Sequence, residues 1–177
     1  YIRAFTKDQY FYKYFGNTLY FVVTLVPIVL ALSLLLAILI NKKTSWVNNI
    51  YRVALFLPSI TSTVAVSMVW LWIFNPDMGL INNFLMAIGL NDVPMWLGDT
   101  AWSKPALVIM RVWQMGGYYM IMFLAGLQTI PETLYEAAEL DGASEIQKFF
   151  RITLPLLSNT TFVVMILLVI EAFNMFE

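Results

Sequence analysis

The sequence predicts an all-α, polytopic transmembrane helical bundle, and two properties of the chain favour this fold class. First, 60% of the 177 residues are hydrophobic and 12% are charged, whereas soluble domains average about 45–50% apolar and about 25% charged residues. Second, long apolar stretches recur along the chain, and a bilayer core about 30 Å thick requires about 20 helical residues. The mean hydropathy of +0.75 agrees with a membrane protein.

The predicted spans cover about residues 19–40, 53–74, 106–127 and 160–176. The first carries no charge, and Pro27 is tolerated there because neighbouring helices satisfy the carbonyl that a proline leaves unpaired. In the second, Pro58 precedes hydroxyl residues that allow close helix contacts, namely Ser59, Thr61, Ser62 and Thr63. The third is less apolar and contains Arg111, so we expect it to line a path or cavity.

The remaining segments divide the chain and suggest its orientation. Residues 1–16 are rich in aromatic and basic residues and are assigned to an extracytoplasmic or interfacial segment, which leaves 17–177 as the core. Loops 41–52 and 128–158 share one side and carry five Lys and Arg residues, whereas residues 1–16 and 75–104 on the opposite side carry four. If residues 1–16 are set aside as the remainder of a loop after a missing helix, the opposite side carries one. Basic residues are enriched on the cytoplasmic side, so the two basic loops are predicted to be cytoplasmic.

The composition excludes several classes of function. A net charge of −1 argues against a nucleic-acid-binding protein. The chain has no Cys and no His, which removes thiol nucleophiles, most zinc sites and most general bases. It also lacks a G-x-x-x-x-G-K-[ST] loop for ATP phosphates. We therefore expect no cofactor, no metal site and no catalytic residue.

Residues 129–155 carry strong local helix signals. Thr129-x-x-Glu132 matches a capping box that would start a helix, with Pro131 in its first turn. This helix should run to Asp141, where Gly142 supplies a left-handed stop.

A second helix should follow that turn. Ser144-x-x-Gln147 is a second capping box, and Pro155 is expected to end this helix, because the residue before a proline avoids the α region. On the first helix, the small side chains of Ala137 and Ala138 leave little bulk on a surface that also carries acidic residues. Such a helix suits a groove with basic groups on another protein, although caps alone would also fit an ordinary loop between spans.

The spacing of residues in this loop is far more specific than its caps. Glu136-Ala137-Ala138, three residues, Gly142, nine residues, Ile152, one residue and Leu154-Pro155 form a seven-position pattern. Chance would produce it at a given start about once in 10⁷–10⁸ trials. The pattern resembles the EAA signature of the membrane-spanning permease subunits of binding-protein-dependent ABC importers.

The resemblance extends from about residue 10 to the end of the chain and is strongest to the carbohydrate-type branch. It rests on residues 123–128, on Ile130-Pro131 and Leu134-Tyr135, on Asp141-Gly142-Ala143-Ser144 and, upstream, on Asn17-Thr18 and Phe56-Leu57-Pro58. This family implies a MetI-like permease core in the bacterial cytoplasmic (inner) membrane with further flanking helices. We therefore expect this chain, which opens on Tyr1 and ends after an apolar run, to be a fragment.

The resemblance also implies partners and a solute. Such a subunit pairs with a second permease subunit, receives a sugar or glycerol-phosphate-like solute from an extracytoplasmic solute-binding protein, and docks its EAA helix on separate ABC ATPase subunits. Glu136 would then meet basic groups of the ATPase, and Gly142 would give the turn that seats the helix.

Arg111 and Glu171 are the ionisable residues placed well inside predicted spans. A charge in hydrocarbon costs about 2.5–3.5 kcal/mol on insertion scales, so each needs a partner or a wet cavity. Counted from the ends of their spans, both lie at a similar depth near the outer surface. They could pair or line a solute path. Alternatively, the Arg111 side chain extends outward to the membrane–water interface, and Glu171 contacts a flanking helix or a partner subunit.

Aromatic residues in the spans allow two interpretations. Trp70, Trp72, Trp113, Tyr118 and Tyr119 could stack on a sugar ring, or they could belong to the interfacial belt and the packing.

Two other function classes also remain open. A secondary transporter or channel driven by an ion gradient should show an inverted repeat and several broken or charged spans. A membrane scaffold would explain the spans and leave the EAA spacing unexplained.

Overall fold

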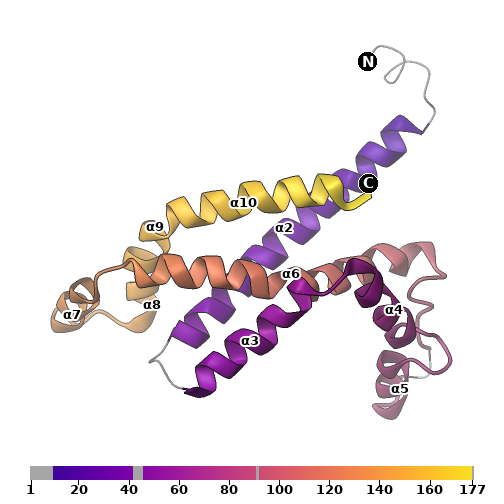
Figure 1. Cartoon of the computed structure of the whole chain (residues 1–177), viewed down its shortest axis with the longest axis horizontal. Helices are drawn as coiled ribbons and strands as arrows, with labels where there is room; N and C mark the ends of the chain where they lie inside the picture. The colour runs from indigo at the N-terminus through magenta and orange to yellow at the C-terminus, as the bar shows by residue number, and fades with distance from the viewer. Residues whose placement is uncertain (1–9, 42–45, 91, 177) are drawn as a thin grey trace.

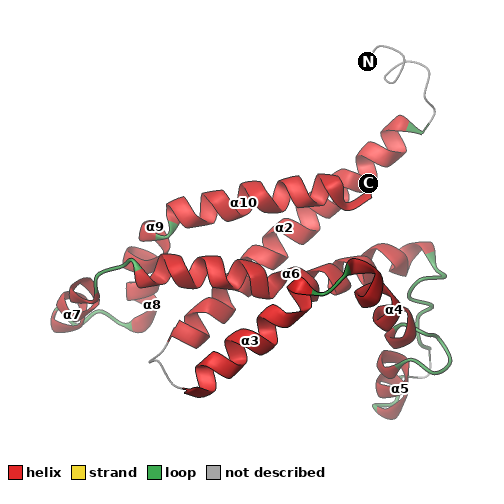
Figure 2. Cartoon of the chain, viewed as in Figure 1, coloured by secondary structure: helices red, strands yellow, loops and turns green. Residues whose placement is uncertain are grey.

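The computed structural model describes residues 10–41, 46–90 and 92–176 (Figure 1). Every regular element in these ranges is a helix, which confirms the all-α prediction (Figure 2). The helices are α2 (Phe11–Asn41), α3 (Trp46–Ile60), α4 (Thr63–Ile73), α5 (Leu80–Ala87), α6 (Thr100–Gln128), α7 (Glu132–Leu140), α8 (Glu145–Lys148), the π-helix η1 (Phe149–Thr153), α9 (Leu154–Leu156), α10 (Ser158–Phe173) and the 3₁₀-helix η2 (Asn174–Phe176).

The first predicted span lies inside α2, which begins earlier, at Phe11. The predicted interfacial segment 1–16 therefore ends within this helix, while residues 1–9 lie outside the described residues, as do Lys42 and Lys43 of the first basic loop. The buried side of α2 contains Phe21, Leu25, Val29, Ser33 and Ala37, which repeat every fourth residue, together with Val26 and Ile40. This spacing places one stripe of the helix against the bundle.

α6 forms the centre of the bundle and packs against α2, α3 and α10 (Figure 1). Two of its glycines permit close approach of neighbouring helices. A Cβ on Gly117 would overlap the backbone of Leu55 in α3, and a Cβ on Gly126 would lie 2.7 Å from Thr160 Oγ1 in α10. Small residues at such contacts let helices pack closely in a membrane.

The second predicted span is divided between two helices, α3 and α4. α3 and α4 meet at an angle of 100° across Thr61 and Ser62. Hydroxyl groups satisfy the end of α3, because Ser59 Oγ donates to the Phe56 carbonyl at 2.7 Å and Thr61 Oγ1 donates to the Leu57 carbonyl at 3.0 Å. Side chains thus replace backbone hydrogen bonds next to Pro58, and the helix can end inside an apolar stretch.

The fourth predicted span corresponds to α10 and η2. The segment Glu145–Leu156 precedes α10 at an angle of 66°. By length and composition, α2 and α6 are each sufficient to cross a membrane. The two bent pairs, Asn48–Ile60 with Thr63–Ile73 and Glu145–Leu156 with Ser158–Phe173, would each form a further span if the two parts of a pair cross the membrane together. The described helices therefore provide two to four spans.

Candidate functional site

α7 follows α6 after a short connection that differs from the predicted capping box. Thr129 is the C-cap of α6, and its hydroxyl donates to the Gly126 carbonyl at 2.8 Å. Pro131 occupies the N-cap of α7, without a side-chain cap hydrogen bond. The prediction was wrong here because the threonine hydroxyl completes the preceding helix instead of starting the next one.

The turn after α7 has the predicted left-handed glycine. Gly142 has φ +75°. Its N–H donates to the Glu139 carbonyl at 3.0 Å, and the N–H of Ala143 donates to the Ala138 carbonyl at 2.9 Å. This pair of bonds defines a Schellman motif, which reverses the chain after a helix.

The second predicted capping box is confirmed. Gln147 Oε1 accepts from the Ser144 N–H at 2.8 Å, and Ser144 Oγ accepts from the Gln147 N–H at 3.4 Å. Both residues lie within the same turn, so this arrangement is local. It fixes the direction of α8 directly after the glycine turn.

Pro155 does not end the second helix as predicted, since the helix continues through η1 and α9. In η1 the N–H of Leu154 donates to the carbonyl of Phe149, five residues earlier. The wider π turn lies immediately before Pro155, which occupies the first turn of α9, where its missing N–H is tolerated. The prediction that Pro155 ends the helix was wrong because the π turn changes the helical pitch just before Pro155, so the helix continues past the proline.

The EAA residues lie on an accessible surface. Glu136, Ala137, Asp141, Gly142 and Pro155 are exposed, whereas Ala138, Ile152 and Leu154 are half-buried. No residue of α7 is buried. Large apolar side chains nearby also face outward, with exposed fractions of 90% for Leu140 and 71% for Ile146.

Lys148 is a buried cation in this loop that the sequence analysis missed. Its Nζ lies 2.7 Å from Glu139 Oε1 and also pairs with Glu145. Hydrogen bonds from the ammonium to Glu139 and Glu145 raise the pKa of Lys148 above its ordinary value. The i,i+3 spacing of Glu145 and Lys148 could have revealed one of these pairs, because such residues lie side by side on a helix.

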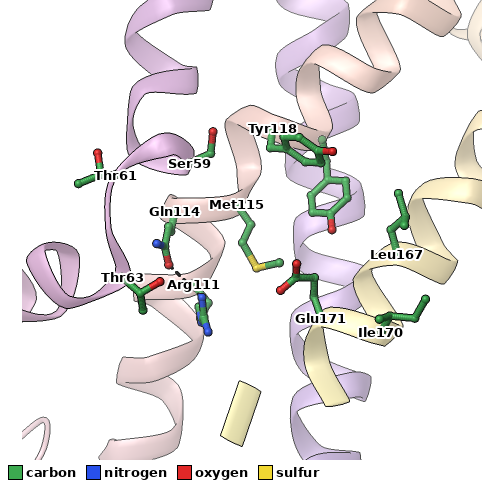
Figure 3. Close-up of a pocket in the computed structure, with 11 residues that line it drawn as sticks. Ser59, Thr61, Thr63, Arg111, Gln114, Met115, Tyr118, Leu167, Ile170 and Glu171 are labelled. Carbon is green, nitrogen blue, oxygen red and sulfur yellow. Dashed lines mark hydrogen bonds between the residues drawn. The ribbon is translucent and has the colours of Figure 1, made fainter. Parts of the chain in front are cut away.

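A cavity of about 370 Å³ brings Arg111 and Glu171 to one place (Figure 3). Its lining comes from α3, the α3–α4 bend, α4, α6 and α10, and comprises Ser59, Thr61, Thr63, Arg111, Gln114, Met115, Tyr118, Tyr119, Leu167, Ile170 and Glu171. Arg111 Nη1 donates to Gln114 Oε1 at 3.1 Å. Within the described part of the chain, the ion pairs found at 4.0 Å or less are those of Lys148. Arg111 and Glu171 thus share the cavity without a direct ion pair.

The predicted aromatic candidates separate into two groups. Tyr118 and Tyr119 line the cavity. Trp113 instead packs against Trp70 with ring centroids 5.7 Å apart, and Trp72 is exposed. Among the described residues, no group of three or more His, Cys, Asp and Glu could hold a metal ion.

The lining of the cavity offers hydroxyl, amide and charged groups beside phenol rings, a combination that can hold a polar solute.

The chain is a bundle of helices long and apolar enough to cross a membrane, with a cavity lined by polar and apolar side chains and an exposed helical loop. The comparisons specify its family. Residues 30–176 match the family described as binding-protein-dependent transport system inner membrane component, and the chain belongs to this family.

Named relatives are permease proteins of transport systems. The chain is 34% identical to the probable ABC transporter permease protein YurN of Bacillus subtilis, over 100% of this chain and 61% of YurN. It is 38% identical to the lactose transport system permease protein LacF of Rhizobium radiobacter, over 85% of this chain and 51% of LacF. The chain thus spans about half to three fifths of these relatives.

A solved structure has the same fold. It is a bacterial alginate ABC transporter in complex with an alginate pentasaccharide-bound periplasmic protein. The TM-score is 0.83 at 29% sequence identity, and the match covers 93% of this chain and 58% of that chain.

Proposed function

We propose that the protein containing this chain is a permease subunit of an ATP-driven importer and that residues 129–155 couple it to a separate ATPase. The observation that carries this proposal is the EAA spacing on an exposed helix. α7 has no buried residue, and Glu136 and Ala137 face outward ahead of a left-handed glycine. A short acidic helix of this shape fits a groove with basic groups on a partner.

The other proposed partners follow from the family and its relatives. A second permease subunit covers the exposed apolar faces of the spans, and an extracytoplasmic solute-binding protein delivers the solute, as the periplasmic protein bound to the alginate transporter suggests. Residues 41–52 and 128–158 face the cytoplasm in this arrangement. The solute is a sugar or glycerol-phosphate-like compound, which agrees with the named substrates lactose and alginate.

We infer further that the cavity between Arg111 and Glu171 belongs to the solute path. Arg111 supplies donors and Glu171 supplies acceptors at different positions of the lining, while Tyr118 and Tyr119 add ring surface. Sugar hydroxyls can both donate to a carboxylate and accept from a guanidinium. The α3–α4 bend brings Ser59 and Thr63 to the same lining.

A gradient-driven secondary transporter is the second candidate, and the 100° bend between α3 and α4 is the observation that favours it. Broken helices of this kind hold substrates in such transporters. The two candidates differ in their energy source. Uptake that requires the ATPase and the binding protein supports the importer, whereas uptake by the permease alone under an ion gradient supports the secondary transporter.

The coupling role is tested in the whole permease, co-expressed with its ATPase and its second subunit. Ala137→Trp should prevent retention of the ATPase on membranes and abolish ATP-driven uptake, because the indole blocks entry of the helix into the groove. Ala87→Trp is the matched control, since Ala87 is an exposed alanine on α5, and it should leave the ATPase bound. Full ATPase retention and uptake with Ala137→Trp would contradict the proposal.

A further inference from the structure

The orientation of α7 depends on polar contacts. Because no residue of α7 is buried, the apolar core cannot hold this helix in place. Its ends connect through Pro131 and through the turn at Gly142, and the backbone hydrogen bonds of that turn are local to the end of α7. The angle at which α7 meets a partner therefore requires side-chain links to the segment that follows.

Lys148 provides the first link across the turn. Its side chain is 7% exposed, whereas the side chains of Glu139 and Glu145 are 63% and 87% exposed. Glu139 lies on α7 and Lys148 ends α8, so the 2.7 Å contact joins the two helices. Burying an ammonium without partners is costly, and hydrogen bonds between charged groups are stronger than neutral ones. The lysine therefore strongly favours the arrangement that brings Glu139 to it.

Tyr135 provides a second link on the same side of α7. Its hydroxyl lies 2.9 Å from Thr153 Oγ1. Tyr135 and Glu139 are four residues apart and share one face of α7, while their partners Thr153 and Lys148 are five residues apart. The π-helix between those partners solves this mismatch, because its i→i+5 bonding brings residues five apart close to one face.

We propose that Lys148 is a positioning residue that sets the angle of α7 toward the ATPase by holding Glu139 across the Gly142 turn. The π-helix η1 aligns this contact with the Tyr135–Thr153 contact, so that two links fix the face of α7. That face lies toward α8 and η1 through these two contacts, and Glu136 and Ala137 remain exposed on α7. The proposal rests on the proposed function, since only a docking partner gives the angle a role.

The experiment uses the whole permease with its ATPase, its second subunit and its binding protein in vesicles. Spin labels on Thr133→Cys and Asn159→Cys report the distance between α7 and α10, because both residues are exposed and the chain has no cysteine of its own. Lys148→Met should broaden the distance distribution and lower the solute imported per ATP hydrolysed about tenfold or more, because the charged hydrogen bond across the turn is lost together with the one to Glu145.

Three further variants sharpen the test. Lys148→Arg keeps the charge and should restore both readouts. Glu139→Gln removes the negative charge of the contact across the turn and leaves the weaker hydrogen bond to a neutral amide. It should broaden the distribution without disturbing the fold, because Glu139 is exposed. Arg151→Met is the matched control, since Arg151 is an exposed cation in η1, and it should leave the label distance unchanged.

The two readouts separate the possible failures. A narrow distribution in both Lys148→Met and Glu139→Gln would overturn the proposal. A broad distribution with an unchanged import ratio would also overturn it, because the angle would then have no role in coupling. The label distance can be measured without the ATPase. A wild-type permease that binds no ATPase would therefore refute the proposed function, while the spectra would still decide whether Lys148 holds α7.

Discussion

The carbonyl oxygen of Leu55 in α3 lies directly against Gly117 in α6, in a position that a Cβ would overlap. This contact fixes how closely α3 approaches α6. Both helices wall the cavity, through Ser59 on one side and Arg111 and Gln114 on the other. The size of the cavity thus depends on a glycine that does not line it.

Gly117→Ala should destabilise the bundle by about 1–3 kcal/mol, the usual cost of forcing extra volume into a packed contact. The obstacle is backbone, which cannot rotate away. Thermal unfolding of the permease in detergent measures the effect. Gly116→Ala is the control, because its Cβ would lie 3.4 Å from Cδ2 of Leu32, the end of a flexible side chain. Equal unfolding temperatures for the two variants would contradict this account.

Asn82 organises the segment between α4 and α6 and gives a second prediction. It is 1% exposed, donates to the carbonyls of Pro76 and Pro94 at 3.2 Å each, and accepts from Trp96 Nε1 at 2.7 Å. Asn82→Ala leaves the indole N–H without its partner, which should cost about 1–3 kcal/mol. Tryptophan fluorescence during urea unfolding should show an earlier transition.

The neighbouring Asn83 serves as the control for Asn82. It is exposed, and its amide donates to the Met78 carbonyl at 3.3 Å. Asn83→Ala should shift the transition by less than about 0.5 kcal/mol, as for most surface substitutions. A comparable loss in both variants would show that the buried amide has no special role.

Features that depend on neighbouring residues could be predicted from the sequence. The charge-free run of the first span, the Ser144–Gln147 capping box and the left-handed Gly142 all follow from local chemistry. The EAA pattern identified the exposed helix because its spacing is long and specific. The fold class follows from hydropathy, since apolar length alone determines which segments can enter a bilayer.

Two kinds of feature could not be predicted: those in which one side chain can bond to either of two backbone groups, and those that depend on packing between residues far apart in the sequence. Thr129 had two adjacent helix ends to cap, and its hydroxyl bonds to Gly126 in the first. The break after Pro58 depends on which carbonyls the Ser59 and Thr61 hydroxyls reach. The Lys148–Glu139 contact closes across a turn, and the cavity requires four helices to meet. The sequence gives the residue types for these contacts and leaves their pairing undetermined.

Arg111 and Glu171 provide a third prediction, concerning the solute path. The structure places both on one cavity, with Arg111 bonded to Gln114 instead of Glu171. Arg111→Gln and Glu171→Gln should each weaken solute uptake about tenfold, as expected when one charged hydrogen bond to a ligand is lost. The measurement is the concentration dependence of uptake by the whole transporter.

The double variant with exchanged charges distinguishes two cases, in which Arg111 and Glu171 each contact the solute or form an ion pair with one another. If each residue contacts the solute, Arg111→Glu with Glu171→Arg should be as defective as the single variants. Recovery of uptake in the double variant would instead demonstrate the pairing expected from the sequence. A silent Arg111→Gln would mean that the guanidinium extends outward to the interface.

The raised pKa of Lys148 gives a fourth prediction, about pH. A group whose folded pKa exceeds its unfolded value contributes stability that is present below the unfolded pKa and is lost as pH rises through the folded pKa. The ordinary lysine value is 10.5. Between about pH 6 and pH 9 the ammonium therefore stays charged, and the label distance between α7 and α10 should not change.

Above the folded pKa of Lys148 the same distance distribution should broaden. Glu139 and Glu145 face the ammonium, and Asp141 and Arg151 line a second cavity that Lys148 also lines. Lys148→Arg should move the onset to higher pH, because a guanidinium keeps its proton longer. An onset that is identical in the two proteins would assign the broadening to another group.

The last prediction concerns Gly142 and separates coupling from folding. Its φ of +75° suits glycine, and a side chain with a Cβ costs about 1 kcal/mol or more there. The space around it is open, with nothing within 4 Å of a Cβ, so the cost comes from the backbone alone. Gly142→Val should leave membrane insertion and expression near normal, since the spans are held by their own hydrogen bonds.

The strain should instead act on the coupling helix. A turn that leaves the left-handed region redirects α7 relative to α8 and misplaces Glu136 and Ala137, so ATPase association or the solute imported per ATP should fall. Gly142→Asn is the matched control, because asparagine tolerates the left-handed region better than valine, and it should retain most of the coupling. If Gly142→Val supported full ATP-dependent uptake, residues 129–155 would not be the coupling element, and the seven-position spacing would be a coincidence.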